Sequence, residues 1–204
     1  MNLVIFGASG SIGRPLTAQA LAAGHTVTTF SRAGTPIDPD ARHLAGDVLD
    51  RTDVERAVAG QDAVLIVLGN GARGNLRGPA TANIIAAMQA TDVRRLVCQS
   101  TLGAGDSYGA LTFYWKYIMF GLLLRAVLAD HNVQEGHVRA SGLDWTILRP
   151  AAFTDGPMTG TYSRDVTPGA KGLSLKIARA DVAHCLLALL DEPQSHGKTI
   201  AVSN

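Results

Sequence analysis

A glycine-spaced turn near the N-terminus constrains the fold of this chain more than any other feature. The apolar run Asn2–Phe6 leads directly into Gly7, Gly10 and Gly13 of the segment GASGSIG. A helical pattern then covers Ser11–Ala23. A strand, a glycine turn and a helix in this order place backbone N–H groups where they can bind a pyrophosphate. The turn therefore predicts a dinucleotide-binding unit of the βαβ type.

Each glycine of this turn has its own physical role. Gly7 permits the tight turn, Gly10 lets the backbone approach a pyrophosphate, and Gly13 lets the helix pack close to the strand. Ser9 and Ser11 can add hydroxyl donors. The alternative is a plain turn of small residues, which we disfavour because three glycines cost conformational entropy without another evident return.

Strand-like and helix-like segments alternate along the rest of the chain, which is typical of an α/β fold. The pattern predicts a doubly wound parallel sheet with helices on both faces and right-handed crossovers. The short helix after the third strand can be capped by Asp50 or Thr52. The predicted strands are His25–Phe30, Ala41–Asp47, Asp62–Gly69, Arg94–Ser100, Asp144–Arg149, Leu173–Ala178 and Lys198–Ser203, and the predicted helices include Thr52–Ala59, Pro79–Thr91 and Asp181–Leu190.

Length and charge exclude several classes of function. The chain has 204 residues with a formal net charge of +1, and it carries no basic block of the kind that binds nucleic acid. Cys98 and Cys185 lack the spacing of a disulfide framework or a metal site, which favours a reducing compartment, the cytoplasm. We expect one domain over residues 1–204, with a loop-rich substrate lobe near residues 151–171.

The apolar segment Leu111–Arg125 is the one candidate for membrane insertion. Lys116 interrupts it, and the uncharged run that remains is far shorter than the ~20 residues of a spanning helix. The sequence therefore predicts no membrane association through this segment.

The residues after the second predicted strand indicate which nicotinamide cofactor is preferred. An NAD site usually has an acid there, whereas this chain has Ser31 and Arg32, with no acid before Asp38. Arg14, just past the glycine turn, can approach the same corner. Either arginine alone would be read as a solvated surface charge. The two arginines together, without the acid, favour a 2′-phosphate and hence NADP(H) over NAD(H).

Three further strand ends carry candidate site residues. Asp47 and Val48 follow the third strand, where adenine would lie, although a helix cap is nearly as good an explanation for Asp47. Leu68 and Gly69 end the fourth strand, and Gly69 lets the chain pass close to a cofactor. Ser100 ends the fifth strand as a candidate catalytic residue, since it can hydrogen-bond a nicotinamide or an acceptor, or cap the next turn.

These segments together resemble the atypical short-chain dehydrogenases/reductases, which include NmrA-like proteins, and most of all the biliverdin-IXβ reductase/flavin reductase group. The resemblance is carried by IFGASGSIGRPL, VTTFSR, the block from Gly46 to Gly69, NIIAAM, Asp130–His131, SGLDWTILRP and TDGPMTGTY. It implies a Rossmann-type sheet of order 3-2-1-4-5-6-7, with NADPH bound across its carboxyl edge. It also implies hydride transfer to a flavin, a quinone or a similar planar acceptor.

The resemblance also implies which residues contact the ligands. Arg73 matches the loop arginine of the family, and Pro150 and Ala151 would contact the nicotinamide. Ala152 stands where the flavin reductase has a histidine, which argues against tetrapyrrole reduction. The implied cofactor contacts are Gly7, Ser9, Gly10, Ser11, Ile12, Arg32, Asp47, Val48, Leu68, Gly69 and Ser100.

The Tyr-x-x-x-Lys pair of the larger reductase family is missing, because none of Tyr108, Tyr114 and Tyr117 stands four residues before a lysine. In that pair the lysine lowers the tyrosine pKa so that it can protonate a carbonyl oxygen. Reduction of a flavin or a quinone needs mainly a hydride, and water can supply the proton. Such a site can work by proximity and stacking.

The aromatic residues of the segment Leu111–Arg125 are candidate acceptor contacts. We expect this segment to form a buried or half-buried helix beside the cleft. Tyr114 and Tyr117 are equally well explained as acceptor contacts or as packing, whereas packing is favoured for Phe113 and Trp115.

Several residues near the C-terminal half look functional but have simpler explanations. His131 and His137 are expected to be surface or packing residues. Arg179 and Asp181 are expected to mark the start of a helix.

Three functions compete on this evidence. The first is an NADPH-dependent reductase of a small planar acceptor, monomeric or homodimeric. The second is a redox sensor that binds NADP(H) and regulates a partner without turnover, as the missing tyrosine–lysine pair and the NmrA-like resemblance allow. An isomerase or dehydratase is disfavoured, because no acid/base pair stands out.

Overall fold

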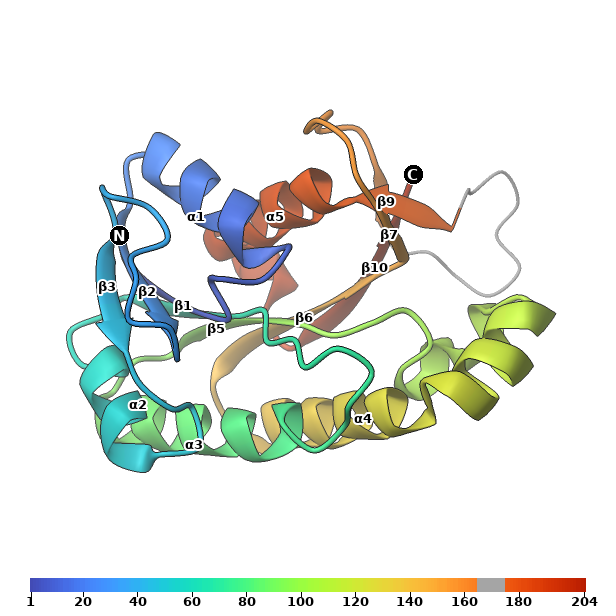
Figure 1. Cartoon of the computed structure of the whole chain (residues 1–204), viewed down its shortest axis with the longest axis horizontal. Helices are drawn as coiled ribbons and strands as arrows, with labels where there is room; N and C mark the ends of the chain where they lie inside the picture. Colours follow the sequence, from blue (N-terminus) through green and yellow to red (C-terminus); the bar gives the residue numbers. More distant parts are fainter. Residues whose placement is uncertain (165–174) are drawn as a thin grey trace.

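The computed structural model describes residues 1–164 and 175–204, and an eight-stranded sheet forms its centre (Figure 1). Its strands are β1 (Asn2–Phe6), β2 (Thr26–Ser31), β3 (Arg42–Ala45), β4 (Ala63–Ile66), β5 (Arg95–Gln99), β6 (Asp144–Pro150), β8 (Ser163–Arg164) and β10 (Lys198–Ser203). They lie in the order β3-β2-β1-β4-β5-β6-β10-β8. All neighbours are parallel except β10 and β8, which pair antiparallel. The predicted order 3-2-1-4-5-6-7 is confirmed, with β10 as the seventh strand.

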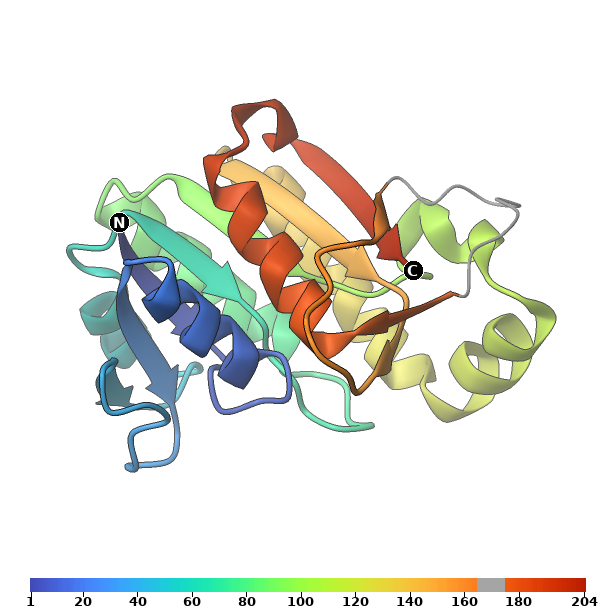
Figure 2. The ribbon, with the colours of Figure 1, turned by 90° about the horizontal axis from the view of Figure 1, so that it is seen from above.

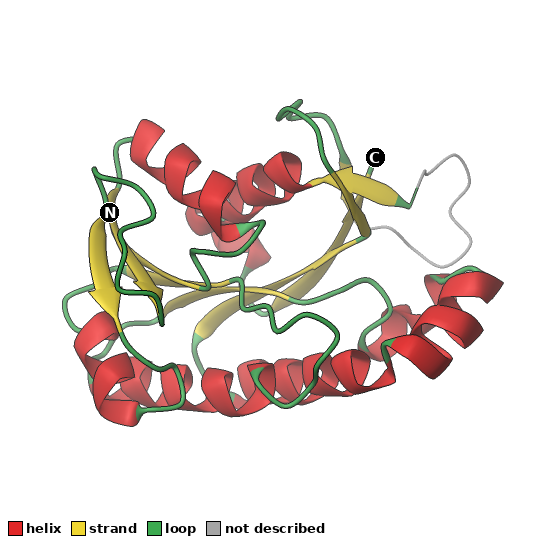
Figure 3. Ribbon diagram, in the orientation of Figure 1, coloured by secondary structure: helices red, strands yellow, loops and turns green. Residues whose placement is uncertain are grey.

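Helices cover both faces of this sheet, as Figures 1 and 3 show. On one face lie α1 (Gly13–Ala22) and α5 (Arg179–Ala188), which pack against each other. On the other face lie α2 (Arg51–Val58), α3 (Arg77–Ala90) and α4 (Arg125–Ala140), which pack side by side. The central strands β1 and β4 are therefore buried on both sides, which explains why their sequences are continuously apolar.

Two of these helices begin with a carboxylate at their N-terminus. The Asp50 side chain accepts from the backbone N–H groups of Thr52 and Asp53 and caps α2, so Asp50 is the cap and Thr52 is not. Helix α3 begins at Arg77, two residues before the predicted start at Pro79. Its cap is supplied across space by Asp130 of α4, which sequence periodicity cannot reveal.

A second, two-stranded sheet stands beside the main one, where Figure 2 shows it near the C-terminal end. It pairs β7 (Ala152–Thr154) with β9 (Lys176–Ala178) in parallel. Residues 165–174 lie outside the described residues, and with them part of the expected substrate lobe and the start of the expected strand Leu173–Ala178.

The short helices include one large correction to the sequence analysis. They are η1 (Gly105–Ala110), η2 (Tyr114–Leu123), η3 (Leu189–Asp191) and η4 (Pro193–Ser195), and η2 has π-helical hydrogen bonding. A helix forms here as expected, and Trp115 and Phe120 line a pocket, but the helix is less buried than expected. Phe120 is its one buried residue, and Tyr114 and Tyr117 are exposed. In Figure 2 the segment projects beyond the layered core, so the sheet does not cover it. Within residues 1–164 and 175–204, no helix has the length and apolarity needed to cross a membrane.

Candidate functional site

A cavity of about 270 Å³ lies at the carboxyl ends of β1, β2 and β4, and we call it the glycine-loop pocket. The parallel strands bring their loops together at this edge, which is where ligands bind in open α/β sheets. The pocket contains most of the cofactor contacts that the sequence implies. These are Gly7, Ser9, Gly10, Ser11, Ile12, Arg32, Asp47, Val48, Leu68 and Gly69.

The three glycines of the turn contribute in different ways to this pocket. Gly7 has a φ of 92°, and a Cβ there would lie 2.6 Å from the Val67 carbonyl oxygen, so the turn requires glycine. A Cβ on Gly13 would collide with the backbone of Gly7 and Ala8, and Gly13 lines no part of the pocket. A Cβ on Gly10 would meet the Gly7 oxygen alone, at 3.2 Å, and otherwise face open space. Gly13 thus serves packing, and Gly10 keeps the cradle clear.

The cradle at the start of α1 fits the pyrophosphate of a dinucleotide. No side chain caps this helix, and Ser11 and Ile12 line the pocket where its first turn begins. Uncapped N–H groups and the positive end of the helix dipole favour an anion. The residues present therefore match what a bound dinucleotide needs.

The two arginines expected at the ribose phosphate do not have the same position. Arg32 lines the glycine-loop pocket, whereas Arg14 does not and donates from Nε to the Ser9 carbonyl at 3.2 Å. The structure therefore brings Arg32 to the site and leaves Arg14 as a support of the turn. Asp47 is the one acid among the described lining residues of this pocket.

The cap of α2 is Asp50, so the helix-cap explanation for Asp47 is wrong, whereas Asp47 does line the pocket. Its Oδ1 accepts from the Leu49 backbone N–H at 3.0 Å, so it holds the local turn while it lines the pocket. Asn83 of α3 donates to the carbonyl oxygens of Val48 and Leu49. This contact of Asn83 fixes the loop where adenine would lie, and it explains the polar residue within the helix segment NIIAAM.

A second cavity of about 220 Å³ adjoins the first, and we call it the aromatic pocket. Arg77, Gln99 and Phe153 line both cavities and form their shared wall. The other residues that line the aromatic pocket are Ser100, Thr101, Leu102, Leu111, Trp115, Phe120, Leu124, Val127, His131, Pro150, Ala151, Ala152 and Leu175. The predicted positions Ser100, Pro150, Ala151 and Ala152 are thus brought together here.

Besides Gly13 and Arg14, three further residues of the sequence-based site are not brought to either pocket. Tyr114 and Tyr117 are 56% and 57% exposed and line neither cavity. Trp115 and Phe120 line the aromatic pocket instead, with ring centroids 5.8 Å apart. The π-helical turn directs Trp115 inward. This position favours an acceptor contact for Trp115, whereas the sequence analysis had favoured packing. Arg73 lies in a separate hollow between α3 and α4.

His131 is buried and lines the aromatic pocket, so the expectation of a surface residue is wrong and that of a packing residue is incomplete. Its Nδ1 lies 3.1 Å from Oε1 of Gln134. Burial, together with the charge of Arg77, lowers the pKa of His131 to about 4, so the imidazole is neutral at pH 7. Its spacing from Val127 and Leu124 on one helix face could have indicated this position.

Ser100 has an unused hydroxyl at the floor of the aromatic pocket. The side chain is 1% exposed, and its Oγ makes no hydrogen bond with any described residue. Its hydroxyl lies near the Glu135 carboxylate and contributes to holding the pKa of Glu135 below its usual range. A buried hydroxyl without a partner is costly, and a ligand in the pocket could satisfy it.

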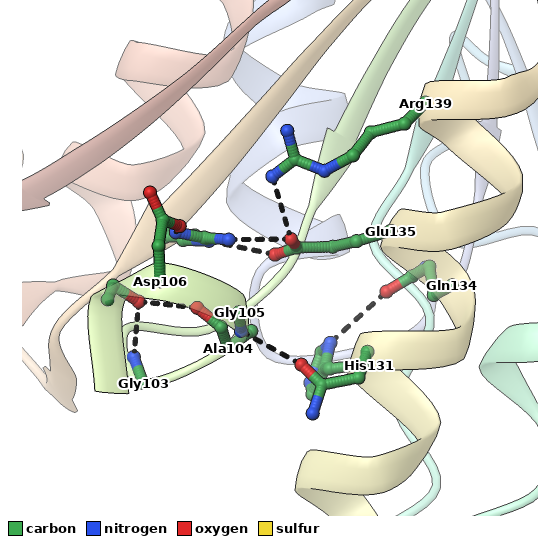
Figure 4. A network of polar contacts seen from close by, with 11 residues as sticks. Gly103, Ala104, Gly105, Asp106, His131, Gln134, Glu135 and Arg139 are labelled. Carbon is green, nitrogen blue, oxygen red and sulfur yellow. Dashed lines mark hydrogen bonds and ion pairs between the residues drawn. The ribbon is translucent and has the colours of Figure 1, made fainter. Parts of the chain in front are cut away.

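An ion-pair network around the buried carboxylate of Glu135 supports this floor (Figure 4). Arg149 donates from Nε and Nη2 to the two oxygens of Glu135, at 2.9 and 2.7 Å, and from Nη1 to Asp106. Burial alone would raise the pKa of Glu135, but the hydrogen bonds from Arg149 outweigh it and hold the pKa below its usual range. The network ties β6 to α4 and to η1.

The same network fixes the chain between β5 and η1. Gly105 donates to Oδ1 of Asn132 at 2.9 Å, and Gly103 donates to Oγ of Ser107 at 2.9 Å (Figure 4). The neighbouring Leu102 forms part of the aromatic pocket. Arg149 and Glu135 therefore serve to position this wall, and neither lines the pocket.

Sequence reasoning missed the shared wall of Arg77, Gln99 and Phe153. None of the three belongs to a motif, and each becomes visible once β4, β5 and β6 are placed side by side. Phe153 follows Ala152, so its position beside the expected nicotinamide contacts was the one available signal. The Arg179 guanidinium lies 5.6 Å from the centre of the Phe153 ring.

Comparison with known proteins agrees with this geometry. Residues 7–193 match the family model for NAD(P)H-binding proteins. An uncharacterized protein of Mycobacterium tuberculosis is 38% identical over 105 residues, which cover 50% of this chain and 12% of that protein. The match therefore spans about an eighth of the length of that relative.

Two solved structures share the fold over nearly the whole chain. ChuY, an anaerobilin reductase from Escherichia coli O157:H7, is 25% identical with a TM-score of 0.83, and 99% of this chain and 96% of ChuY are covered. A short-chain dehydrogenase/reductase from Veillonella parvula DSM 2008 in complex with NADP is 22% identical with a TM-score of 0.82, and 100% and 94% are covered. Because the family model covers most of its length, this chain belongs to the NAD(P)H-binding family of atypical short-chain dehydrogenases/reductases.

Proposed function

We propose that this protein is an NADPH-dependent reductase of a flavin, a quinone or a similar planar acceptor. The observation that carries the proposal is the wall of Arg77, Gln99 and Phe153 that the two pockets share. A dinucleotide held by the glycine turn can reach past this wall, and a flat molecule can lie beyond it. NADPH supplies a hydride when bound.

The preference for NADPH over NADH is supported by Arg32. Its side chain lines the glycine-loop pocket at the end of β2, where a ribose 2′-substituent would lie. A guanidinium can pair with a phosphate through two parallel hydrogen bonds. The complex of the Veillonella parvula protein with NADP is consistent with this choice.

Acceptor binding is supported by the composition of the aromatic pocket. Trp115, Phe120 and Phe153 supply rings, and most other lining residues are apolar. Flat rings between such side chains gain stacking and burial energy. This arrangement holds an acceptor close to the shared wall, and proximity of the two reactants is itself a large part of catalysis.

The protein's own residues point to water as the proton source. The imidazole of His131 is neutral at pH 7, because its pKa is about 4. Tyr114 and Tyr117 are exposed and do not line the pocket. Ser100 would hydrogen-bond the nicotinamide amide or the acceptor through its free hydroxyl. Planar acceptors with exposed basic atoms can take a proton from water.

Oxidation of NADPH under anaerobic conditions against a panel of flavins and quinones tests the proposal. We expect at least one acceptor to be reduced with saturation kinetics. Trp115→Ala should raise the KM of that acceptor and leave NADPH affinity unchanged. Absence of oxidation with every acceptor, despite tight NADPH binding, would count against a reductase.

A non-catalytic redox sensor is the second candidate, and the surface of η2 favours it. Phe113 and Leu122 are 73% and 72% exposed, and Leu123 and Ile118 are exposed beside them. Clustered apolar side chains of this kind often mark a contact region. A sensor would bind NADPH without turnover and present this segment to a protein partner.

A further inference from the structure

Arg77 is the one charged residue among the described residues that line the aromatic pocket. It lies at the start of α3, is 7% exposed, and opens onto both pockets at their shared wall. The other titratable residue of this lining is His131, whose imidazole is neutral at pH 7. An otherwise apolar pocket therefore carries a single positive charge.

The guanidinium of Arg77 is incompletely paired. Its Nε and Nη1 are buried and donate no hydrogen bond to any described residue. The nearest carboxylate is Asp130, with Oδ2 at 3.6 Å from Nη1, which is too long for a hydrogen bond. Burial outweighs this neighbour and lowers the pKa of Arg77, although an arginine stays charged at any working pH.

Asp130 forms a buried ion pair with Arg77 at this distance but no hydrogen bond, because its oxygens accept from backbone N–H groups. Oδ2 accepts from the backbone N–H groups of Leu76 and Arg77, at 3.1 and 2.9 Å, and Oδ1 accepts from Gly78 at 2.9 Å. The carboxylate thus caps α3. A buried charge without hydrogen-bond partners is costly, so it points to a group that arrives with a ligand.

Two neighbours of Arg77 in the pocket also have buried polar atoms without a hydrogen-bond partner among the described residues. Gln99 lies on the shared wall with its Oε1 buried and unpaired, and Ser100 has an unpaired Oγ next to it in the chain. Unused polar groups from two elements, α3 and the end of β5, thus meet at one place. Each can bind a polar group of a ligand whose remaining surface is apolar.

We propose that the aromatic pocket is selective for planar molecules with one anionic group, and that Arg77 binds this group. The identity of that molecule as the hydride acceptor rests on the function proposed above. A cofactor phosphate could also supply an anion, but the glycine-loop pocket already offers the start of α1 and Arg32 for phosphates. The aromatic pocket offers no other cation among its described lining residues.

Two isosteric probes that NADPH does not reduce test this selectivity by calorimetry. They are 2-naphthoate, which is anionic, and 2-naphthamide, which is neutral. The protein is loaded with NADPH, so that the glycine-loop pocket is filled and the nicotinamide ring carries no charge. We expect naphthoate to bind at least about tenfold more tightly than naphthamide, because it can form a hydrogen bond between two charged groups with Arg77.

Variants assign this preference to a residue. Arg77→Gln should abolish the preference, and Arg77→Lys should keep part of it. NADPH affinity is measured for both variants, because Arg77 also lines the glycine-loop pocket. Arg125→Gln is the matched control, because it removes an equal charge from an exposed position that lines neither pocket. It should leave the preference intact.

Three results would overturn the inference. Equal binding of the two probes to the wild type would remove anion selectivity, whether or not any variant folds. If Arg77→Gln still prefers naphthoate, another residue binds the anionic group. If Arg77→Gln loses NADPH affinity and keeps the preference, Arg77 binds the cofactor and not the planar molecule. None of these measurements needs turnover, so a failure of the proposed reductase activity is detected separately.

Discussion

Asp130 of α4 holds the first turn of α3 through the backbone N–H of Arg77, at 2.9 Å, while the guanidinium of the same Arg77 stays beyond hydrogen-bond distance of that carboxylate. The carboxylate thus stabilises the helix start, and the arginine side chain remains available at the wall between the two pockets. We therefore expect substitutions of the two residues to differ in their effect on the free energy of unfolding.

Asp130→Asn should lower the free energy of unfolding by about 1.5–3 kcal/mol at pH 7, because a charged cap loses a backbone partner and an amide NH₂ then faces the N–H of Gly78. Burial alone would raise the pKa of Asp130, but the backbone hydrogen bonds lower it. A lowered pKa gives stability that is present above the unfolded-state pKa of about 3.9 and is lost as the pH falls through the folded-state value. The difference between wild type and variant in urea unfolding should therefore shrink toward pH 3. A difference independent of pH would contradict this role.

Arg77→Gln should change the free energy of unfolding by less than about 1 kcal/mol. Its Nε and Nη1 make no hydrogen bonds that the substitution could break, and Asp130, its ion-pair partner at 3.6 Å, keeps three backbone N–H donors. Urea unfolding of this variant beside Asp130→Asn makes the comparison direct. A loss as large as that of Asp130→Asn would show that Arg77 is a structural partner and not a ligand-binding residue.

Arg32→Ala should weaken NADPH binding by about 1.5–3 kcal/mol and leave NADH binding nearly unchanged, because the lost contact is with the 2′-phosphate. Arg14→Ala is the matched control, since Arg14 lies on the same side of the turn but outside the pocket. Calorimetry with both nucleotides measures the four affinities. If Arg14→Ala removes the preference and Arg32→Ala does not, the assignment of the two arginines is reversed.

Gly10→Val should abolish nucleotide binding without unfolding the protein, because a side chain there would fill the space of the cradle and meet little else. Gly13→Ala should instead destabilise the fold, since its Cβ would collide with the backbone of Gly7 and Ala8. Circular dichroism and nucleotide titration of both variants separate the two effects. Normal affinity in a folded Gly10→Val protein would place the dinucleotide elsewhere.

Tyr114→Phe and Tyr117→Phe should each keep turnover within about tenfold of the wild type, because a positioned general acid contributes roughly 10²–10⁴ and these hydroxyls lie outside the pocket. Trp115→Ala, by contrast, should chiefly raise the KM of the acceptor. Steady-state kinetics with a flavin or quinone that the wild type reduces gives both constants. A loss of several hundredfold in kcat for either tyrosine variant would show that a tyrosine has moved into a catalytic role.

The parts of the fold that depend on local pattern could be predicted from the sequence. Gly7 is required by the turn itself, and β1 and β4 are apolar because both of their faces are covered. The position of the cofactor pocket could also be predicted, because parallel strands place their loops at one edge of the sheet. Arg32 was found for the same reason.

The parts that depend on contacts between distant segments could not be predicted. The cap of α3 comes from Asp130, more than fifty residues away, and the shared wall joins Arg77, Gln99 and Phe153 from three elements. The apolar segment containing Tyr114 and Tyr117 was expected to be buried or half-buried, and most of its side chains are exposed. An apolar segment becomes buried only if the rest of the fold leaves an apolar surface for it to pack against, and its own hydrophobicity does not reveal this. Here the other helices already cover both faces of the sheet.

The most direct test of the central claim is an anaerobic single-turnover measurement with NADPH deuterated at the transferred position of its nicotinamide. Protein loaded with one equivalent of this cofactor is mixed with the best acceptor of the flavin and quinone panel, and loss of reduced nicotinamide absorbance is followed beside the undeuterated cofactor. The account predicts stoichiometric oxidation that is slower with deuterium, because hydride passes directly from the cofactor to an acceptor held beyond the shared wall. Tight binding of NADPH without oxidation by any acceptor would contradict it and favour the sensor.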